Sequence, residues 1–319
     1  MLRQAQDRET REPAVEAVGL VKDFGDTRAV DGISLDVPAG TIYGMLGPNG
    51  AGKTTTLRLL LGIIDPSSGT RRLLGRDRPL DAARQVGYLP EERGLYPAMA
   101  AREAIAFMGA LRGLPLREGR RRADQLLANH GLSEWGRKPI RTLSKGMAQT
   151  VQLLGTIIHR PRLLVLDEPF SGLDAINQAK LEEMIRAQAK DGVTIIFSTH
   201  VISHAERLCE RIAIIAGGKL AFEGGVDEAR DRLRPIVRLR TRSDDGPWRA
   251  AIPDNARRVG KEWVFELPPG GPEPLLKALI DGEAGIETLA IERPGLHDAF
   301  VAIAGDAAAA AMGELGQGR

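Results

Sequence analysis

The residues best suited to chemistry form a glycine-rich stretch, Gly47-Pro-Asn-Gly-Ala-Gly-Lys-Thr54. It follows the pattern G-x-x-x-x-G-K-[ST], between a strand-like run (41–46) and a helix-like run (55–61). Glycines let a backbone curl around an anion, and the positive end of the next helix adds to the field. Lys53 can reach the β- and γ-phosphates, and Thr54 offers a hydroxyl to Mg²⁺. A glycine turn before an ordinary helix is the alternative, but the pattern favours a nucleoside triphosphate site.

Two neighbouring carboxylates, Asp167 and Glu168, follow the apolar run Leu163-Leu-Val-Leu. A buried strand would deliver both to the edge of a sheet. There Asp167 can hold Mg²⁺ through water, and Glu168 can act as general base toward an attacking water. Two acids at a strand end are also common without such a role. His200 follows the next predicted strand (193–198), where it can contact a γ-phosphate or serve a purely structural role.

Two further segments surround the carboxylates. The segment Leu143-Ser-Lys-Gly-Met147 opens a predicted helix, with Ser144 as a good N-cap and Gly146 allowing close approach to an anion. By itself this segment fits a capped helix equally well. The segment Ser171-Gly-Leu-Asp174 follows the carboxylates directly.

The hydrophobic pattern predicts the frame that must position these residues. Strands at 15–24, 33–37 and 41–46 form a β-rich opening, and helix-like polar sequence dominates from about 92 to 138. After that, helices at 147–159, 175–190 and 201–209 alternate with strands at 163–166, 193–198 and 212–216, which predicts a parallel sheet covered on both faces. Beyond about 230, strands at 235–242, 262–267 and 285–292 and a helix at 274–280 predict a small α+β unit.

The bulk composition limits the classes of protein that fit. A chain of 319 residues, 43% apolar, can form one large domain and a smaller one. A net charge of +2 provides no strong field, so we expect no nucleic-acid partner. Cys209 is the single cysteine, which excludes an intramolecular disulfide and fits a reducing cytoplasm. No apolar run approaches the about 20 residues of a membrane helix, so we expect that the chain does not cross a bilayer alone.

Taken in order, these motifs resemble the nucleotide-binding subunit of an ABC transporter, over about residues 15 to 229. The resemblance implies an α/β protein with the P-loop ABC ATPase fold, whose mostly parallel sheet accompanies a β-rich N-terminal part. The ABC domain would span 15–232, with a helical subdomain at about 92–142. A polar extension (1–14), a small α+β accessory domain (233–305) and a flexible tail (306–319) complete the expected organisation.

The resemblance also implies roles for single residues. Glu168 and His200 match the catalytic carboxylate and the switch histidine, and Asp174 matches the loop that joins two sites. Phe24 matches the aromatic residue that stacks on adenine, with core packing as the alternative. The ATP-binding residues would be Phe24, Gly47, Pro48, Asn49, Gly50, Ala51, Gly52, Lys53, Thr54 and Thr55. Mg²⁺ would be held by Thr54, Glu91 and Asp167, the last through water.

The signature motif of the family matches Ser144, Lys145 and Gly146 and would contact ATP bound to the opposite subunit. Two departures stand out. Lys145 and Met147 replace a glycine and a glutamine, and Glu91 replaces a glutamine that helps to hold Mg²⁺. A carboxylate is also a hard oxygen ligand, so metal binding at Glu91 is compatible with the change. The added negative charge predicts a retuned rate of hydrolysis.

The segment Pro90-Glu-Glu-Arg-Gly-Leu-Tyr96, the signature and the run 291–300 resemble a narrower group, the ATPase subunits of bacterial ABC-2-type exporters, including the sodium-efflux type. The resemblance implies an ATP hydrolase on the cytoplasmic face of the cell membrane. Its partners would be a polytopic membrane permease and a second copy of itself or a related ATPase subunit. The alternative is a soluble ABC-type ATPase that acts as a switch or assembly factor. Trp248, Trp263 and His297 in the accessory domain are expected to be packing residues.

Overall fold

The computed structural model describes residues 12–92, 94–243 and 245–305, which form two compact units. One unit runs to Gly225 and includes the described chain from Ile303, and the other comprises Val226–Ala302. The sequence predicts a domain boundary between residues 232 and 233, which differs from this division into units and remains a prediction. The expected tail (306–319) and most of the N-terminal extension (1–14) lie outside the described residues.

A six-stranded sheet forms the centre of the first unit, in the order β5-β6-β7-β3-β8-β9. The first five strands pair in parallel, and β9 pairs antiparallel with β8. Every residue of β6, β7 and β3 is buried, as expected of parallel strands that are covered on both faces. The predicted α/β fold is therefore confirmed. The strands are β3 (Ile42–Leu46), β5 (Val86–Leu89), β6 (Leu163–Asp167), β7 (Thr194–Thr199), β8 (Arg211–Ala216) and β9 (Lys219–Gly225).

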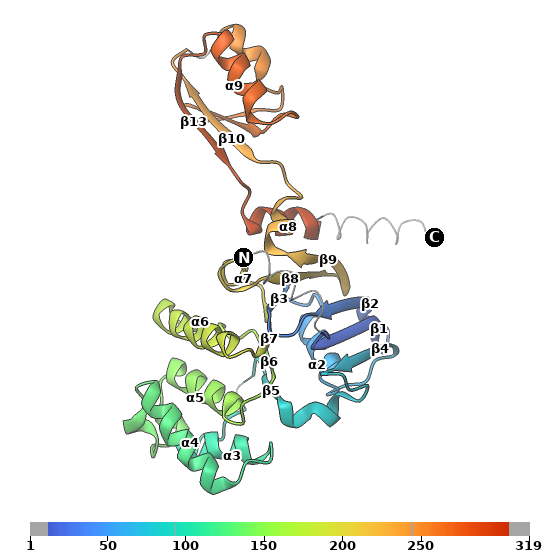
Figure 1. Ribbon diagram of the computed structural model, residues 1–319, viewed down its shortest axis with the longest axis vertical. Coiled ribbons are helices and arrows are strands. Elements are labelled where there is room, and N and C mark those ends of the chain that lie inside the picture. Colours follow the sequence, from blue (N-terminus) through green and yellow to red (C-terminus); the bar gives the residue numbers. More distant parts are fainter. Residues whose placement is uncertain (1–11, 93, 244, 306–319) are drawn as a thin grey trace. The chain divides into compact units, whose positions relative to one another are not determined.

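Alternate residues of the central strands point to opposite faces, and each face carries its own hydrophobic cluster. Leu164 and Leu166 of β6 join a cluster with α3, α4, α5 and α6, whereas Leu163 and Val165 join a second cluster with α2 and the antiparallel sheet. Figure 1 shows α5 and α6 on one side of the central strands and α2 on the other. These helices are α2 (Lys53–Leu60), α3 (Ala101–Ala110), α4 (Leu116–Asn129), α5 (Lys145–Ile157) and α6 (Ala175–Lys190).

The β-rich opening is a three-stranded antiparallel sheet in the order β2-β1-β4. Its first strand, β1 (Val15–Phe24), has the predicted bounds, and β2 (Thr27–Val37) begins earlier than predicted. The edge strand β4 (Ser68–Leu73) was not predicted, because only Leu73 is buried in its polar sequence. The remaining helical elements of this unit are η1 (Pro79–Gln85), η2 (Ser133–Trp135), η3 (Ile140–Thr142) and α7 (Ile202–Leu208).

The second unit is the predicted small α+β domain. Its antiparallel sheet has the order β11-β12-β10-β13, and Trp248 is buried in a core that Trp263 also contacts. His297 is exposed, so a packing role for this residue is wrong. Its elements are α8 (Val226–Arg230), β10 (Ile236–Thr241), η4 (Pro247–Ala251), β11 (Arg257–Val259), β12 (Glu262–Glu266), α9 (Pro272–Asp281) and β13 (Ile286–Glu292). Across the described residues of both units, no helix has the length and apolar character needed to span a bilayer.

Candidate functional site

The glycine-rich loop joins β3 to α2, and its glycines are required by close packing. A Cβ on Gly47 would collide with the backbone oxygen of Ile215, and one on Gly52 would lie 2.5 Å from the backbone oxygen of Ala29. Gly52 also has a φ of +102°, which side chains rarely tolerate. The sequence thus folds this loop into a curl at the start of α2, where free N–H groups of the first turn face outward.

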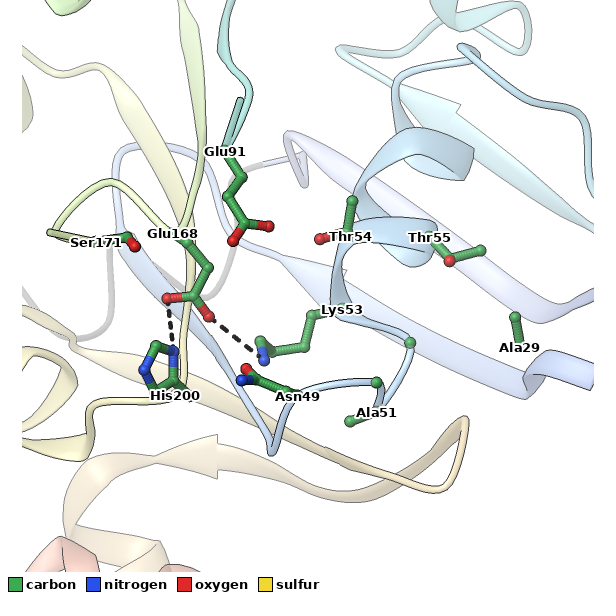
Figure 2. A pocket seen from close by; sticks show the side chains of 12 residues that line it. Ala29, Asn49, Ala51, Lys53, Thr54, Thr55, Glu91, Glu168, Ser171 and His200 are labelled. Atoms are coloured by element: carbon green, nitrogen blue, oxygen red, sulfur yellow. Dashed lines mark hydrogen bonds and ion pairs between the residues drawn. The ribbon is translucent and has the colours of Figure 1, made fainter. Parts of the chain in front are cut away.

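A cavity of about 470 Å³ opens over the loop (Figure 2). It brings residues of the glycine-rich loop, Lys53 and Thr54 among them, together with Glu91, Glu168 and His200, which the sequence predicts from three other segments. Ala29 was not predicted, because it carries no motif signal. Ser171 begins the segment Ser171–Asp174 that the sequence singles out, but only Asp174 of that segment was predicted as a site residue. The complete lining is Ala29, Asn49, Gly50, Ala51, Gly52, Lys53, Thr54, Thr55, Glu91, Glu168, Ser171 and His200.

Lys53 is the buried cation of this cavity. Its side chain is 6% exposed, and Nζ donates to the carbonyl oxygens of Gly47 (2.8 Å) and Pro48 (3.1 Å). Nζ also lies 3.5 Å from Oε1 of Glu168. A buried ammonium group needs hydrogen-bond partners or negative charges to replace water, and phosphate oxygens provide both. The position of Lys53 therefore suits the binding of a phosphate group within the cavity.

Asp167 is held below the cavity by two hydroxyl groups. Thr54 Oγ1 donates to its Oδ1 at 3.0 Å, and Ser198 Oγ donates to the same oxygen at 2.6 Å. Ser198 Oγ also accepts the backbone N–H of Glu168 at 2.9 Å. Ser198 was not predicted as a site residue. Ser198 lies opposite Asp167 in the parallel register of β6 and β7. The sequence alone does not give this register, so it could not identify Ser198.

Glu168 lies between Lys53 and His200. Its Oε2 is 3.0 Å from Nδ1 of His200, whereas its Oε1 faces Lys53, and Figure 2 shows both contacts. Glu168 has a φ of +45°, a left-handed backbone conformation that costs a non-glycine residue about 1–3 kcal/mol. Such strain persists where surrounding contacts over-determine the conformation, and the bond from the Glu168 N–H to Ser198 is one of them. The carboxylate is thereby aimed into the cavity.

The oxygen atoms of this region fit Mg²⁺. Oδ2 of Asp167 and Oε1 of Glu168 are buried and have no hydrogen-bond partner among the described residues. The described part of the chain contains no cluster of three or more His, Cys, Asp or Glu side chains suited to a metal. Mg²⁺ commonly binds through one or two carboxylates, a hydroxyl, water and substrate phosphates, so it does not need such a cluster. Thr54, Asp167 and Glu91 supply oxygen atoms of this kind.

The signature segment forms the start of α5, as predicted. Ser144 is the N-cap of this helix, and its Oγ accepts the N–H of Met147 at 3.2 Å. A Cβ on Gly146 would lie 2.5 Å from the side chain of Asn177, which in turn donates to the Asp174 carboxylate. Asp174 caps α6 by accepting the N–H of Asn177. Ser144, Gly146 and Asp174 therefore lie close together, and none of the three lines the cavity of its own chain.

Lys145 lies apart from its neighbours in the signature segment. Its side chain passes over Gly172, so that a Cβ on this glycine would collide with Nζ. It lines a second cavity of about 400 Å³ together with Glu91, Glu92, Gln149, Glu168 and Ser171. Three of these residues, Glu91, Glu168 and Ser171, line the first cavity as well. Lys145 therefore faces the carboxylates of its own chain.

Phe24 does not line the cavity over the glycine-rich loop. It is the last residue of β1, and 51% of its surface is exposed. Lys22 Nζ lies 5.2 Å from the centre of its ring. The exposure makes the core-packing alternative wrong, and it leaves the aromatic face available for a planar ligand. A role in adenine stacking stays a prediction.

Known proteins resemble this chain in both sequence and fold. The ABC transporter family model matches residues 30–171. YhaQ of Bacillus subtilis, described as an uncharacterized ABC transporter ATP-binding protein, is 34% identical over 293 residues, which cover 88% of this chain and 95% of YhaQ. DrrA of Streptomyces peucetius, the daunorubicin/doxorubicin resistance ATP-binding protein, is 37% identical over 74% of this chain and 72% of DrrA.

A solved ATP-binding subunit of an ABC transporter superposes with a TM-score of 0.63 at 30% sequence identity. The match covers 69% of this chain and 92% of the solved one, so nearly the whole subunit has a counterpart here. The resemblance that the motifs indicate is thus confirmed at the level of sequence and fold. The chain belongs to the ABC transporter ATP-binding proteins, which bind ATP and hydrolyse it in transport.

Proposed function

We propose that this chain hydrolyses ATP to power a separate membrane permease, and that the transporter they form is an exporter. The name of DrrA, a drug-resistance protein, supports export, as does the likeness of Pro90–Tyr96 and the signature to the ABC-2-type group. The observation that carries hydrolysis is the Glu168 carboxylate, held at 3.0 Å from His200 over the phosphate-binding loop. The subunit would lie on the cytoplasmic face of the membrane.

Each residue has a step in this proposal. When ATP enters, its phosphates replace the loop carbonyls as partners of the Lys53 ammonium. Glu168 accepts a proton from a water molecule, whose oxygen attacks the γ-phosphorus. The bond from this phosphorus to the bridging oxygen breaks, which leaves ADP and phosphate. His200, bonded to Glu168 Oε2, keeps the carboxylate in line with the attacking water. Mg²⁺ bound by Thr54, Asp167 and Glu91 would neutralise the developing charge on the phosphates.

A second ATPase subunit completes the site in this proposal. Ser144 is exposed and does not line the cavity of its own chain. Asp174 and Ile176, at the start of α6, are exposed as well. In a head-to-tail pair, Ser144 and Gly146 of one subunit would cover the ATP of the other, which gives two equivalent sites in a homodimer. A related ATPase subunit could take the place of the second copy.

The helical subdomain offers a surface for the permease. Tyr96 and Leu111 are 60% and 68% exposed, and Tyr96 packs edge-to-face against the half-exposed Phe107, with ring centres 6.1 Å apart. Phe107 and Leu111 lie one turn apart at α3, so their side chains share a face. Exposed apolar side chains that cluster in this way mark protein contact sites. A helix of the permease on the cytoplasmic side fits this surface.

The proposal is tested with Glu168→Gln protein in Mg-ATP. We expect it to bind ATP, hydrolyse little and accumulate as a dimer in light scattering. When tagged, it should retain a stoichiometric polytopic protein from detergent-solubilised membranes. A monomeric and fully active Glu168→Gln protein would contradict the mechanism. A dimer that retains only soluble proteins would favour the switch or assembly factor instead.

A matched pair of variants tests the docking surface. The Leu111→Ser protein should no longer retain the permease in the same pull-down, because the serine hydroxyl would lie in the apolar contact between α3 and the permease. Val18→Ser changes an equally exposed residue (63%) on β1 and should retain the permease. Equal retention by both variants would place the docking surface elsewhere.

A further inference from the structure

Behind the cavity, the loop after β6 makes a second contact with the chain segment that carries His200. The Phe170 ring, 4% exposed, stacks on the imidazole of His204 with ring centres 4.0 Å apart and planes 10° apart. Phe170 also meets Phe197 of β7 edge-to-face at 5.9 Å. Phe170 is two residues beyond Glu168. His204 lies in α7, four residues beyond His200, which precedes this helix.

The His204 ring is buried and held by charged partners. It is 2% exposed, and its Nδ1 lies 3.1 Å from Oε1 of Glu182 on α6. Arg207, one turn along α7, donates to the same Glu182 oxygen at 2.5 Å and lies 3.0 Å from the His204 Nδ1. Glu182 can accept from both residues, whereas Nδ1 cannot donate to Glu182 and accept from Arg207 at once. A proton on Nδ1 therefore satisfies the whole cluster.

The charge state of Glu182 agrees with this assignment. Burial acts to raise the pKa of its carboxyl, but hydrogen bonds from Arg207 and His204 outweigh this effect and leave the pKa below its usual value. Glu182 is thus a carboxylate at neutral pH, and it accepts a hydrogen bond from the Nδ1–H of His204. The ring is fixed on one side by Glu182 and on its face by Phe170.

Two contacts constrain a helix more than one does. The bond from His200 to Glu168 alone would let α7 rotate about this contact, whereas the stack of His204 on Phe170 adds a second point of attachment to the same loop. We infer that His204 is a positioning residue for ATP hydrolysis: its stack on Phe170 and its bond to Glu182 orient α7, so that His200 meets Glu168. This inference rests on the roles proposed above for Glu168 and His200.

Three substitutions separate the two contacts of His204. His204→Ala removes both, His204→Phe keeps the stack, and His204→Gln keeps a hydrogen-bond donor toward Glu182. We expect His204→Ala to lower kcat about tenfold and to change the KM for ATP less than about twofold, because the displaced group acts in the hydrolytic step. His204→Phe and His204→Gln should each recover part of this loss, because each keeps one of the two contacts that orient α7. Equal rates for all three and wild type would overturn the inference.

A double-mutant cycle shows whether His204 acts through His200. Radiolabelled ATP detects the slow hydrolysis of the His200→Ala protein. Adding His204→Ala to this protein should lower kcat by less than about a further twofold, because His200, the side chain that His204 positions, is already removed. Independent, multiplying losses would overturn the inference. Leu208→Ala, at a buried position (5% exposed) of the same helix, is the control for general damage and should lose stability but keep kcat. If Leu208→Ala lowered kcat as much as His204→Ala, the effect would be packing alone.

Failure of the inference and failure of the proposed function give different results. If His200→Ala and Glu168→Gln leave ATP hydrolysis intact, the proposed roles of these two residues are wrong. If those two variants hydrolyse ATP far more slowly than wild type but His204→Ala retains full kcat, only the positioning role is wrong. Unfolding in urea, measured for each variant, shows that the kcat values compare folded proteins.

Discussion

The hydroxyl of Ser198 is the contact whose removal tests the site most directly. It is fully buried, donates to Asp167 Oδ1 at 2.6 Å and accepts the N–H of Glu168 at 2.9 Å. In Ser198→Ala, Asp167 Oδ1 keeps only its bond from Thr54, and the Glu168 N–H loses its partner. The substitution thus removes one of the two hydrogen bonds that hold Asp167 at the proposed metal site. It also frees the strained backbone of Glu168, the proposed general base.

The size of the effect follows from these two bonds. A hydrogen bond to a charged group contributes about 1.5–3 kcal/mol and a neutral one about 0.5–1.5 kcal/mol, so we expect Ser198→Ala to lower the free energy of unfolding by about 3 kcal/mol. For a unit of this size, such a loss lowers Tm by about 6–12 °C. A small displacement of Glu168 should also lower kcat about 10- to 100-fold.

Urea unfolding and steady-state ATP hydrolysis measure both effects. Ser67→Ala is a matched control, because Ser67 Oγ also accepts a backbone N–H, from Asp23 at 3.0 Å, but in an exposed bond. The control should lose less than about 1 kcal/mol and keep its kcat. If Ser198→Ala unfolds and hydrolyses ATP like Ser67→Ala, the two bonds of Ser198 do not support the site, and the reasoning is refuted.

Three further predictions concern charge and domain organisation. Glu91→Gln removes a negative charge from the cavity of Glu168, so we expect a faster ATPase and a shifted Mg²⁺ dependence; unchanged values in a Mg²⁺ titration would contradict this. The pKa of Glu182 is depressed, so its contribution to stability is present above its unfolded pKa near 4.5 and is lost as pH falls through the lower folded value. Glu182→Gln should therefore be about 1 kcal/mol less stable than wild type at pH 7, and this difference should shrink as pH falls below 4.5, as measured by urea unfolding. A chain that ends at residue 232 should change the dimerisation or ATPase rate that light scattering and phosphate release report, and unchanged values would exclude a role of the accessory domain.

The sequence predicts the central strands and the residues at their ends for one physical reason. Buried parallel strands are continuous apolar runs, and their carboxyl ends meet at one edge, so the hydrophobic pattern alone places Asp167 and His200 together. The same reasoning misses β4, where only Leu73 is buried, and β5, which has four residues. Short or exposed strands carry too few apolar residues to show their period.

Contacts that depend on strand register or helix rotation lie beyond the sequence pattern. Ser198 reads as an ordinary strand residue until β6 and β7 are paired and place it opposite Asp167. Phe170 and His204 carry no signal in the sequence pattern, and only the rotation of α7 stacks one ring on the other. Phe24 shows the same limit, because only its exposure in the folded chain decides against core packing.

The two departures from the family pattern acquire a common meaning in the fold. Glu91 adds a carboxylate where the family has a neutral glutamine, and Lys145 adds an ammonium where the family has a glycine. The two side chains come from different segments, yet both line the cavity that also contains Glu168. Their opposite charges leave the net charge around Glu168 the same as with the two neutral residues. Both side chains are exposed, so solvent screens each charge. We expect that changing either residue alone disturbs the proposed general base modestly, and more than changing both.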